Sequence, residues 1–355
     1  MIITVDCRMF NSSGIGAYIR GCLPFLLQSE NNFLLIGSAE QLRQFSEFKN
    51  VCITECCIKP FSLKELFFFP LKILKQINKS DLFFTPFFNI PSNIKIPVFT
   101  TIHDIIFADM PQITSKIGLK IRMIFYRRAY KKSKKNFTVS YFSKSRIEYH
   151  LGIGKPVIVT YSAIQQKFLD YKAASINKIK KDTIIFIGNI KKHKGLDCLL
   201  DALFLAKKDG LPHRLIIIGS MDNFRSSDNA IINKIESIGG DSISFSGFVS
   251  DEKLMDYISE SSLLVQPSLY EGFCLPPLEA MVLGTKALIS DIPVLKEVYS
   301  EYPVTFFTAG DALDLKNKLM EILYKKDAPS LSLPEHLIYK YTFQKAASIL
   351  LNNFS

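Results

Sequence analysis

The sequence predicts an α/β protein made of two doubly wound, Rossmann-like domains. Three observations lead to this prediction. Short β-branched and aromatic runs alternate with amphipathic stretches along the 355 residues, which is typical of parallel sheets covered by helices on both faces. The runs form two series of about six, and the length accommodates two or three domains. Hydrophobic residues make up 48% of the chain and charged residues 22%, which excludes disorder for most of its length.

The expected strands follow in chain order. In the first half they are Ile2–Asp6, Phe33–Ile36, Val51–Thr54, Asp81–Phe84, Val98–Ile102 and Asn136–Val139. In the second half they are Thr183–Ile187, Arg214–Ile218, Ser242–Ser246, Ser262–Gln266, Lys286–Ser290 and Val304–Phe307. Helical patterns between them include Ala17–Gln28, Leu196–Lys208, Asp251–Glu260 and Ala312–Tyr324.

A polar, lysine-rich segment, Ser162–Asp182, has weak periodicity and marks the expected join between the domains. We therefore expect an N-terminal domain over 1–165 and a C-terminal domain over 166–335. A C-terminal helix in 336–355 is expected to pack back towards the N-terminal domain.

Several protein classes are not expected from the composition. No run reaches the ~18 apolar residues of a membrane-spanning helix, and the first residues lack the pattern of a secretory signal. The seven cysteines are scattered without a CxxC pair, and there are only five histidines. We therefore expect no disulfide framework and no structural zinc site, and a chain that works in the reducing cytoplasm.

Positive charge is concentrated in the first half. Residues 1–165 hold 22 Lys and Arg against 10 Asp and Glu, whereas residues 166–355 are nearly balanced. The segment Lys116–Lys135 contains nine of these cations and no acid, interleaved with apolar residues. Such a basic amphipathic helix suits the anionic inner face of the plasma membrane, and the apolar run Leu66–Leu71 is expected to dip into the same interface. The alternative is a solvated basic face over a buried apolar stripe. Nucleic acid is not expected as a partner, because no recognition-helix signature is present.

Two candidate ligand loops follow strands of the first half. In doubly wound sheets, ligands bind beyond the carboxyl ends of the strands, and between two facing domains the expected site is the cleft. Gly14 and Gly16 follow the first strand, where glycines let a phosphate approach the backbone; the alternative is an ordinary tight turn. His103 and Asp104 directly follow the fifth strand. They suit a ligand-facing pair, or alternatively a capping Asp beside a hydrogen-bonded His.

Two further loops follow strands of the second half. Gly188–Gly195 contains three lysines, which suits a diphosphate or alternatively a solvated basic turn. After the fourth strand of this half, Pro276 and Pro277 favour a helix start, which would aim the N–H groups of Phe273, Cys274 and Leu275 at a ligand. Glu271 and Glu279 could then accept hydrogen bonds from sugar hydroxyls. The alternative for Glu279 is a carboxylate that only balances the helix dipole.

Taken together, these motifs resemble glycosyltransferase family 4, the retaining enzymes with the GT-B fold. The glutamates of Glu271-Gly-Phe-x-Leu-Pro-x-Leu-Glu279 have the spacing of that family's E-x7-E motif. The likeness covers most of residues 1–307 in the right order. The other matching segments are Gly14-Ile15-Gly16-x-Tyr18, Ile102-His103-Asp104, Ser140-x-Phe142-Ser143-Lys144, Gly188…His193-Lys194-Gly195, Ser246–Leu254 and Pro267–Tyr270.

The resemblance implies a retaining hexosyltransferase of bacterial surface-polysaccharide synthesis. It implies a nucleotide-diphosphate sugar donor held mainly by the C-terminal domain, a glycan or lipid-linked acceptor on the N-terminal domain, and no metal or other cofactor. The implied catalytic residues are His103, Glu271 and Lys194. The implied donor-binding residues are Gly14, Gly16, Asn189, Lys194, Gly219, Phe248, Val249, Glu271, Phe273, Cys274, Leu275 and Glu279. The residues expected towards the acceptor or the membrane are Asp104, Lys120, Arg127, Arg128 and Lys131.

The sequence departs from the family pattern at two positions. Asn189 stands where many members carry an Arg, so the diphosphate charge would rest on Lys194, with help from Lys191 or Lys192. Ser162-Ala163-Ile164 stands where the joining segment often reads Asn-Gly-Val. The donor stays open between mannose from GDP, rhamnose from dTDP, and a UDP sugar. A sugar-nucleotide epimerase and a non-catalytic nucleotide-binding partner subunit are the alternatives, whereas the incomplete glycine fingerprint and the paired glutamates disfavour a nicotinamide dehydrogenase.

Overall fold

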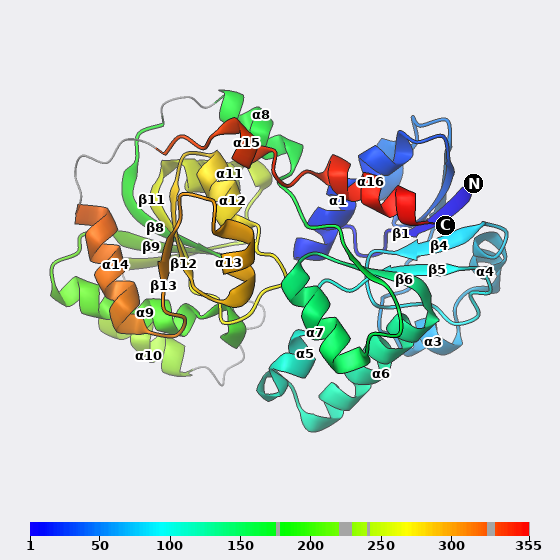
Figure 1. Cartoon of the computed structure of the whole chain (residues 1–355). Helices are drawn as coiled ribbons and strands as arrows, with labels where there is room; N and C mark the ends of the chain where they lie inside the picture. The colour runs from blue at the N-terminus through cyan, green and yellow to red at the C-terminus, as the bar shows by residue number, and fades with distance from the viewer. Residues whose placement is uncertain (175–177, 220–228, 240–241, 325–330, 355) are drawn as a thin grey trace. The chain divides into compact units, whose positions relative to one another are not determined.

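The computed structural model describes residues 1–174, 178–219, 229–239, 242–324 and 331–354 (Figure 1). The chain folds into two compact units: Met1–Gln165 with Tyr341–Ser355 form unit 1, and Gln166–Lys340 form unit 2. Each unit contains one wholly parallel sheet. The predicted pair of Rossmann-like sheets is confirmed.

Unit 1 has a seven-stranded sheet in the order β3-β2-β1-β4-β5-β6-β7. Its strands are β1 Ile2–Asp6, β2 Asn32–Gly37, β3 Val51–Glu55, β4 Leu82–Thr85, β5 Val98–Thr101, β6 Ser133–Thr138 and β7 Val157–Val159. Its helices are α1 Ser13–Leu27, α2 Ala39–Leu42, α3 Leu63–Phe67, α4 Leu71–Ile77, α5 Ile106–Asp109, α6 Lys116–Lys132, α7 Tyr141–Leu151 and α16 Phe343–Asn353. Strand β7 was not predicted, because three residues behind Pro156 are too few to show a strand pattern.

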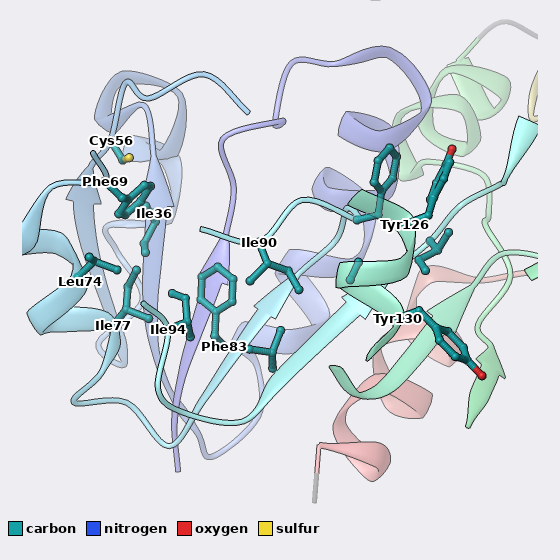
Figure 2. Packing of buried hydrophobic residues seen from close by; sticks show 14 of the residues in the cluster. Ile36, Cys56, Phe69, Leu74, Ile77, Phe83, Ile90, Ile94, Tyr126 and Tyr130 are labelled. Atoms are coloured by element: carbon teal, nitrogen blue, oxygen red, sulfur yellow. The ribbon is translucent and has the colours of Figure 1, made fainter. Parts of the chain in front are cut away.

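The core of unit 1 lies on both faces of this sheet. Phe83 on β4 belongs to an apolar cluster with Leu74 of α4 and Tyr126 of α6 (Figure 2). The next residue, Phe84, points to the opposite face, because successive side chains alternate along a strand. There it packs against Phe354, which directly follows α16.

The structure has a C-terminal helix within 336–355 that belongs to unit 1, although it begins only at Phe343. The structure divides this stretch into α15, Glu335–Ile338, in unit 2 and α16 in unit 1. Helix α16 packs along α1. Residues 339–342 separate the two helices, and the Thr342 side chain caps the start of α16.

Unit 2 has the six predicted strands, in the order β10-β9-β8-β11-β12-β13. They are β8 Lys181–Ile187, β9 Arg214–Ile218, β10 Ile243–Gly247, β11 Ser261–Gln266, β12 Lys286–Ser290 and β13 Thr305–Phe307. The helices are α8 Gln166–Ala174, α9 Leu196–Lys208, α10 Asn229–Ile238, α11 Asp251–Glu260, α12 Pro276–Val282, α13 Pro293–Tyr299, α14 Ala312–Tyr324 and α15. Helices α9 and α14 pack together over one face of the sheet (Figure 1).

The strand order defines one switch point in each unit. In unit 2 the chain runs from β8 outward to β10 and then returns to β11 on the other side of β8. In unit 1 the corresponding neighbours are β1 and β4. Ligands of doubly wound sheets bind beyond the strand ends at such points, so the loops after β8 and β11, and after β1 and β4, frame the candidate sites.

Candidate functional site

In unit 2, the loops after β8 and β11 pack directly on each other. The backbone N–H of Leu269 donates to the His193 carbonyl at 2.8 Å. Gly195 has a φ of +69°, and a Cβ there would lie 1.8 Å from the Pro267 carbonyl oxygen. Glycine is therefore required at this position both for its backbone conformation and for the close approach of the second loop.

Lys194 and Glu271 meet at this junction. The Lys194 Nζ lies 2.7 Å from Glu271 Oε1 and 2.9 Å from Oε2. Ser268 Oγ donates a further hydrogen bond to Oε1 at 2.7 Å. Burial opposes ionisation of Glu271, but the Lys194 charge and these hydrogen bonds outweigh it, so the Glu271 pKa lies below its ordinary value. The structure thus brings together a cation and a carboxylate predicted to bind different parts of one donor.

The expected helix start after β11 is confirmed, because α12 begins at Pro276. Cys274 has a φ of +75° and turns the chain into the helix. The Cys274 carbonyl accepts a hydrogen bond from the buried Tyr299 hydroxyl, which fixes this turn. Phe273 and Cys274 lie just before α12, and their side chains are buried.

Glu279 lies in the first turn of α12 and is 8% exposed. No described residue donates a hydrogen bond to its carboxylate. Burial raises the Glu279 pKa to about 7, and the charges of Lys167 and Asp251 act on it in opposite directions. A buried carboxyl group without donors is suited to accept hydrogen bonds from a ligand's hydroxyls.

Other predicted donor residues lie at neighbouring strand ends of unit 2. Gly219 follows β9, and a Cβ there would lie 2.2 Å from the Gly188 carbonyl oxygen, so this glycine lets the loops after β8 and β9 approach. Asn189 lies in the loop after β8. Phe248 and Val249 follow β10, and the Phe248 ring is 93% exposed. The donor-binding residues predicted for this unit therefore lie in the loops after four adjacent strands, except for Glu279, which lies in α12.

In unit 1, the helix after β1 begins earlier than expected. Gly14 and Gly16 were predicted in a turn before a helix from Ala17, but α1 begins at Ser13 and includes both. A Cβ on Gly16 would lie 2.4 Å from the Phe10 carbonyl oxygen, so glycine is needed there for packing. A Cβ on Gly14 would meet no atom within 4 Å.

His103 follows β5 and is hydrogen-bonded in place. Its Nε2 lies 2.9 Å from the Pro86 carbonyl oxygen, after β4, and its ring packs edge-on against Tyr18. Burial lowers the His103 pKa to about 4. The ring is therefore neutral at pH 7; since a carbonyl only accepts, Nε2 carries the proton and Nδ1 is an acceptor. Asp104 accepts a hydrogen bond from the N–H of Ile106, the first residue of α5.

A buried ion cluster at the switch point of unit 1 was not predicted. Arg8, after β1, pairs with Asp6 and with Glu65 of α3, and the Arg8 Nη2 lies 2.6 Å from Glu65 Oε1. Asn89, after β4, donates to the same glutamate. The charged pair Asp6 and Arg8 at a strand end was a visible signal, but the partner Glu65 lies 57 residues later in the chain.

The basic segment forms α6, which ends at Lys132, so Lys134 and Lys135 lie on β6 instead. Lys120, Arg127 and Lys131 are exposed. Arg128 is half-buried and donates hydrogen bonds to the Ile90 and Pro91 carbonyls, which gives it a structural role. No helix in the described part of the chain is long and apolar enough to cross a membrane. Within the same ranges, no group of three or more His, Cys, Asp or Glu side chains has the arrangement of a metal site.

Comparisons with known proteins concern the family and the fold. Residues 169–340 match the family model described as glycosyl transferases group 1. Among solved structures, the fold resembles a sucrose-phosphate synthase from Thermosynechococcus elongatus, with a TM-score of 0.72, 15% identity and coverage of 99% of this chain and 98% of that one. It also resembles Anabaena HepE in complex with UDP and glucose, with a TM-score of 0.66, 16% identity and coverage of 100% and 96%. The family match and the fold support a GT-B glycosyltransferase.

Two of the similar curated proteins are mannosyltransferases. The chain is 28% identical over 222 residues to the serotype-specific mannosyltransferase WbdA of Escherichia coli. This match covers 59% of this chain and 27% of that protein. The chain is also 28% identical over 184 residues to the O-antigen chain mannosyltransferase RfbU of Salmonella typhimurium strain LT2, a match that covers 50% and 49%. The matches thus span between about a quarter and about half of these relatives.

Proposed function

We propose that this protein is a retaining hexosyltransferase of family 4 that transfers mannose from a nucleotide-diphosphate donor to a glycan or lipid-linked acceptor. The proposed setting is bacterial surface-polysaccharide synthesis at the cytoplasmic face of the plasma membrane. The observation that carries this proposal is the Lys194–Glu271 pair at the switch point of unit 2, with Glu279 at the start of α12. Mannose is favoured over rhamnose or glucose because the relatives WbdA and RfbU are mannosyltransferases.

The residues have separate roles in the proposed reaction. The bond between the sugar C1 and the phosphate oxygen breaks, and the acceptor oxygen forms a bond to C1 on the same face. The acceptor's proton goes to the departing phosphate oxygen, so no separate base is required. Lys194 balances the charge that develops on the diphosphate, Glu271 accepts hydrogen bonds from the transferred sugar, and Glu279 accepts them from the ribose.

The proposal also assigns a role in sugar binding to His103 of unit 1. Its Nε2 proton is already bound by the Pro86 carbonyl, which leaves Nδ1 as an acceptor for a sugar hydroxyl. The proposal includes no resident metal, since Lys194 supplies the positive charge.

Two measurements test the proposal. Thermal shift with GDP, UDP and dTDP identifies the base, because a ligand raises the melting temperature with ln(1+[L]/Kd); we expect the largest shift with GDP. Turnover with GDP-mannose and a lipid-linked acceptor then tests transfer. A new glycosidic bond supports the proposal, whereas binding without turnover indicates a partner subunit, and sugar inversion without an acceptor indicates an epimerase.

A further inference from the structure

Unit 1 carries exposed apolar side chains on α3, directly after it and at the start of α4. Leu63, Phe67, Phe68 and Leu71 are each between 70% and 76% exposed, and we refer to them as the α3–α4 apolar patch. The neighbouring Phe69 is buried and points into the core beside Ile36 and Cys56 (Figure 2). Part of the apolar run Leu66–Leu71 is therefore buried in the core, and other side chains of the run are exposed to solvent. A cluster of large exposed apolar groups costs solubility and is typical of an interaction surface.

Helix α3, which carries part of the patch, is held in place by buried polar contacts. Helix α3 has five residues, which is too short to be stable alone. It is held by Glu65, whose carboxylate is fully buried, pairs with Arg8 and accepts from the Phe61 N–H at 2.8 Å. Ser62 caps the helix by accepting from the Glu65 N–H. The exposed Phe67 and Phe68 thus lie at the end of an anchored helix and directly after it.

The surroundings of the patch are positively charged. Between residues 57 and 80 the only acid is the buried Glu65. The exposed cations of this stretch are Lys59, Lys64, Lys72, Lys75 and Lys79. An apolar centre surrounded by cations complements an anionic lipid surface, where each cation near the headgroups contributes about 1 kcal/mol.

Helix α6 extends this surface. The Phe61 ring, just before α3, contacts the Phe125 ring of α6 at a centroid distance of 5.4 Å. The exposed side chains of α6 combine apolar and basic groups. They are Lys116, Ile117, Lys120, Ile121, Ile124, Arg127 and Lys131. Apolar and cationic side chains therefore share the exposed surface of both neighbouring segments.

We propose that the α3–α4 apolar patch inserts into the headgroup and acyl-chain boundary of an anionic bilayer, while the lysines around it and the exposed cations of α6 bind lipid phosphates. This rests on the proposed function, because a lipid-linked acceptor would itself be held in the bilayer. The partner is the bilayer itself. Insertion distinguishes this mode from attachment by charge alone.

Vesicle co-sedimentation of the full chain tests both components. We expect binding to phosphatidylcholine vesicles that contain phosphatidylglycerol, weakened by salt, and little binding to pure phosphatidylcholine. The double variant Phe67→Ser/Phe68→Ser should lower the partition coefficient at least about tenfold. Leu313→Ser is the matched control, because Leu313 is an exposed apolar residue of α14 in unit 2; it should bind like the parent. Equal partitioning of the double variant and the parent would overturn the proposal.

Insertion depth has a direct readout because the chain has no tryptophan. The Phe67→Trp variant should shift its emission to the blue with anionic vesicles and be quenched by lipids brominated on the acyl chain, whereas Leu313→Trp should do neither. An unshifted emission of the Phe67→Trp variant, or a change in oligomeric state without vesicle binding, would contradict insertion. Thermal shift with GDP on the same variants separates the two proposals. A variant that keeps the GDP shift but loses vesicle binding has lost only the membrane surface. A parent protein without a GDP shift would contradict the proposed function instead.

Discussion

Lys194 and Glu271 illustrate how two predicted site residues constrain each other. The sequence predicts both residues near a donor, but it shows no sign that they pair with each other. The pair keeps Glu271 ionised in a buried place and holds the Lys194 ammonium at the switch point. A donor would then compete for Lys194 with a carboxylate that the protein itself provides.

Lys194→Met should therefore reduce both activity and stability. We expect kcat/KM to fall by roughly 10²-fold, the effect of losing a charge-stabilising group. We also expect the free energy of unfolding to fall by about 3 kcal/mol, because Glu271 is left buried without its counter-ion. The double variant Lys194→Met/Glu271→Gln should recover much of the stability and none of the activity, as measured by denaturant unfolding and initial rates. Equal instability of the single and double variants would contradict the pairing.

Glu279 gives nucleotide binding a pH dependence near neutrality. Its raised pKa of about 7 means that the free carboxyl group is largely protonated at pH 6. Ribose hydroxyls that donate to the carboxylate favour the ionised form, so binding should release a proton and affinity should rise between pH 6 and pH 8. Calorimetry in buffers of different ionisation enthalpy measures the released proton.

Glu279→Gln is the control for the nucleotide's own titration, which affects both proteins equally. The parent should show the steeper increase in affinity with pH, and the variant should lose the additional proton release. Stability should change in the opposite direction: a folded-state pKa above the unfolded value of about 4.5 makes the free energy of unfolding decrease as the pH rises from about 4.5 to 7. Identical pH profiles of parent and variant would show that Glu279 does not titrate in this range.

At the scale of elements, the loops after β8 and β11 determine where the site residues lie. The two loops touch through Gly195 and Pro267, and through the hydrogen bond from Leu269 to His193. The loop that carries Lys194 is therefore positioned by the loop that carries Glu271. This contact joins segments about 75 residues apart in the sequence, and only the strand order places them together.

Gly195→Ala should disrupt this contact. The added Cβ would lie 1.8 Å from the Pro267 carbonyl oxygen, so the loops must separate in addition to the cost of a positive φ. Gly210→Ala is the matched control, because Gly210 has a φ of +87° and its Cβ would meet nothing closer than 3.9 Å. We expect about 1 kcal/mol of destabilisation and normal activity for Gly210→Ala, and a larger loss of stability with reduced kcat/KM for Gly195→Ala. Equal effects of the two substitutions on melting temperature and rate would show that the loop contact is unimportant.

At the scale of the whole molecule, the chain leaves unit 1 to form unit 2 and then returns. Helix α16 and Phe354 complete the core of unit 1 about 175 residues after Gln165. The Phe354 ring lies 5.2 Å from the Phe84 centroid and 5.3 Å from that of Phe99. The last residues of the chain are thus a structural part of the first domain.

Phe354→Ala should lower the free energy of unfolding of unit 1 by about 3–5 kcal/mol, the usual cost of removing a buried aromatic ring. Asn352→Ala, at an exposed position two residues earlier, should have little effect. Thermal unfolding followed by circular dichroism compares the two variants. A melting profile of Phe354→Ala equal to that of the parent would mean that the C-terminal residues do not support unit 1.

The sequence by itself determined the alternation of strands and helices and the loops that follow them, because side-chain periodicity and glycine or proline positions act over a few residues. That information sufficed for the fold class, for all six strands of unit 2, and for Lys194, Glu271 and Glu279 as candidates. Only the tertiary structure decided that Lys194 pairs with Glu271, that Arg8 pairs with Glu65, and which residues of the run Leu66–Leu71 face outward. Those outcomes depend on strand order and on which groups become buried together, and such long-range contacts leave no mark in the local sequence pattern.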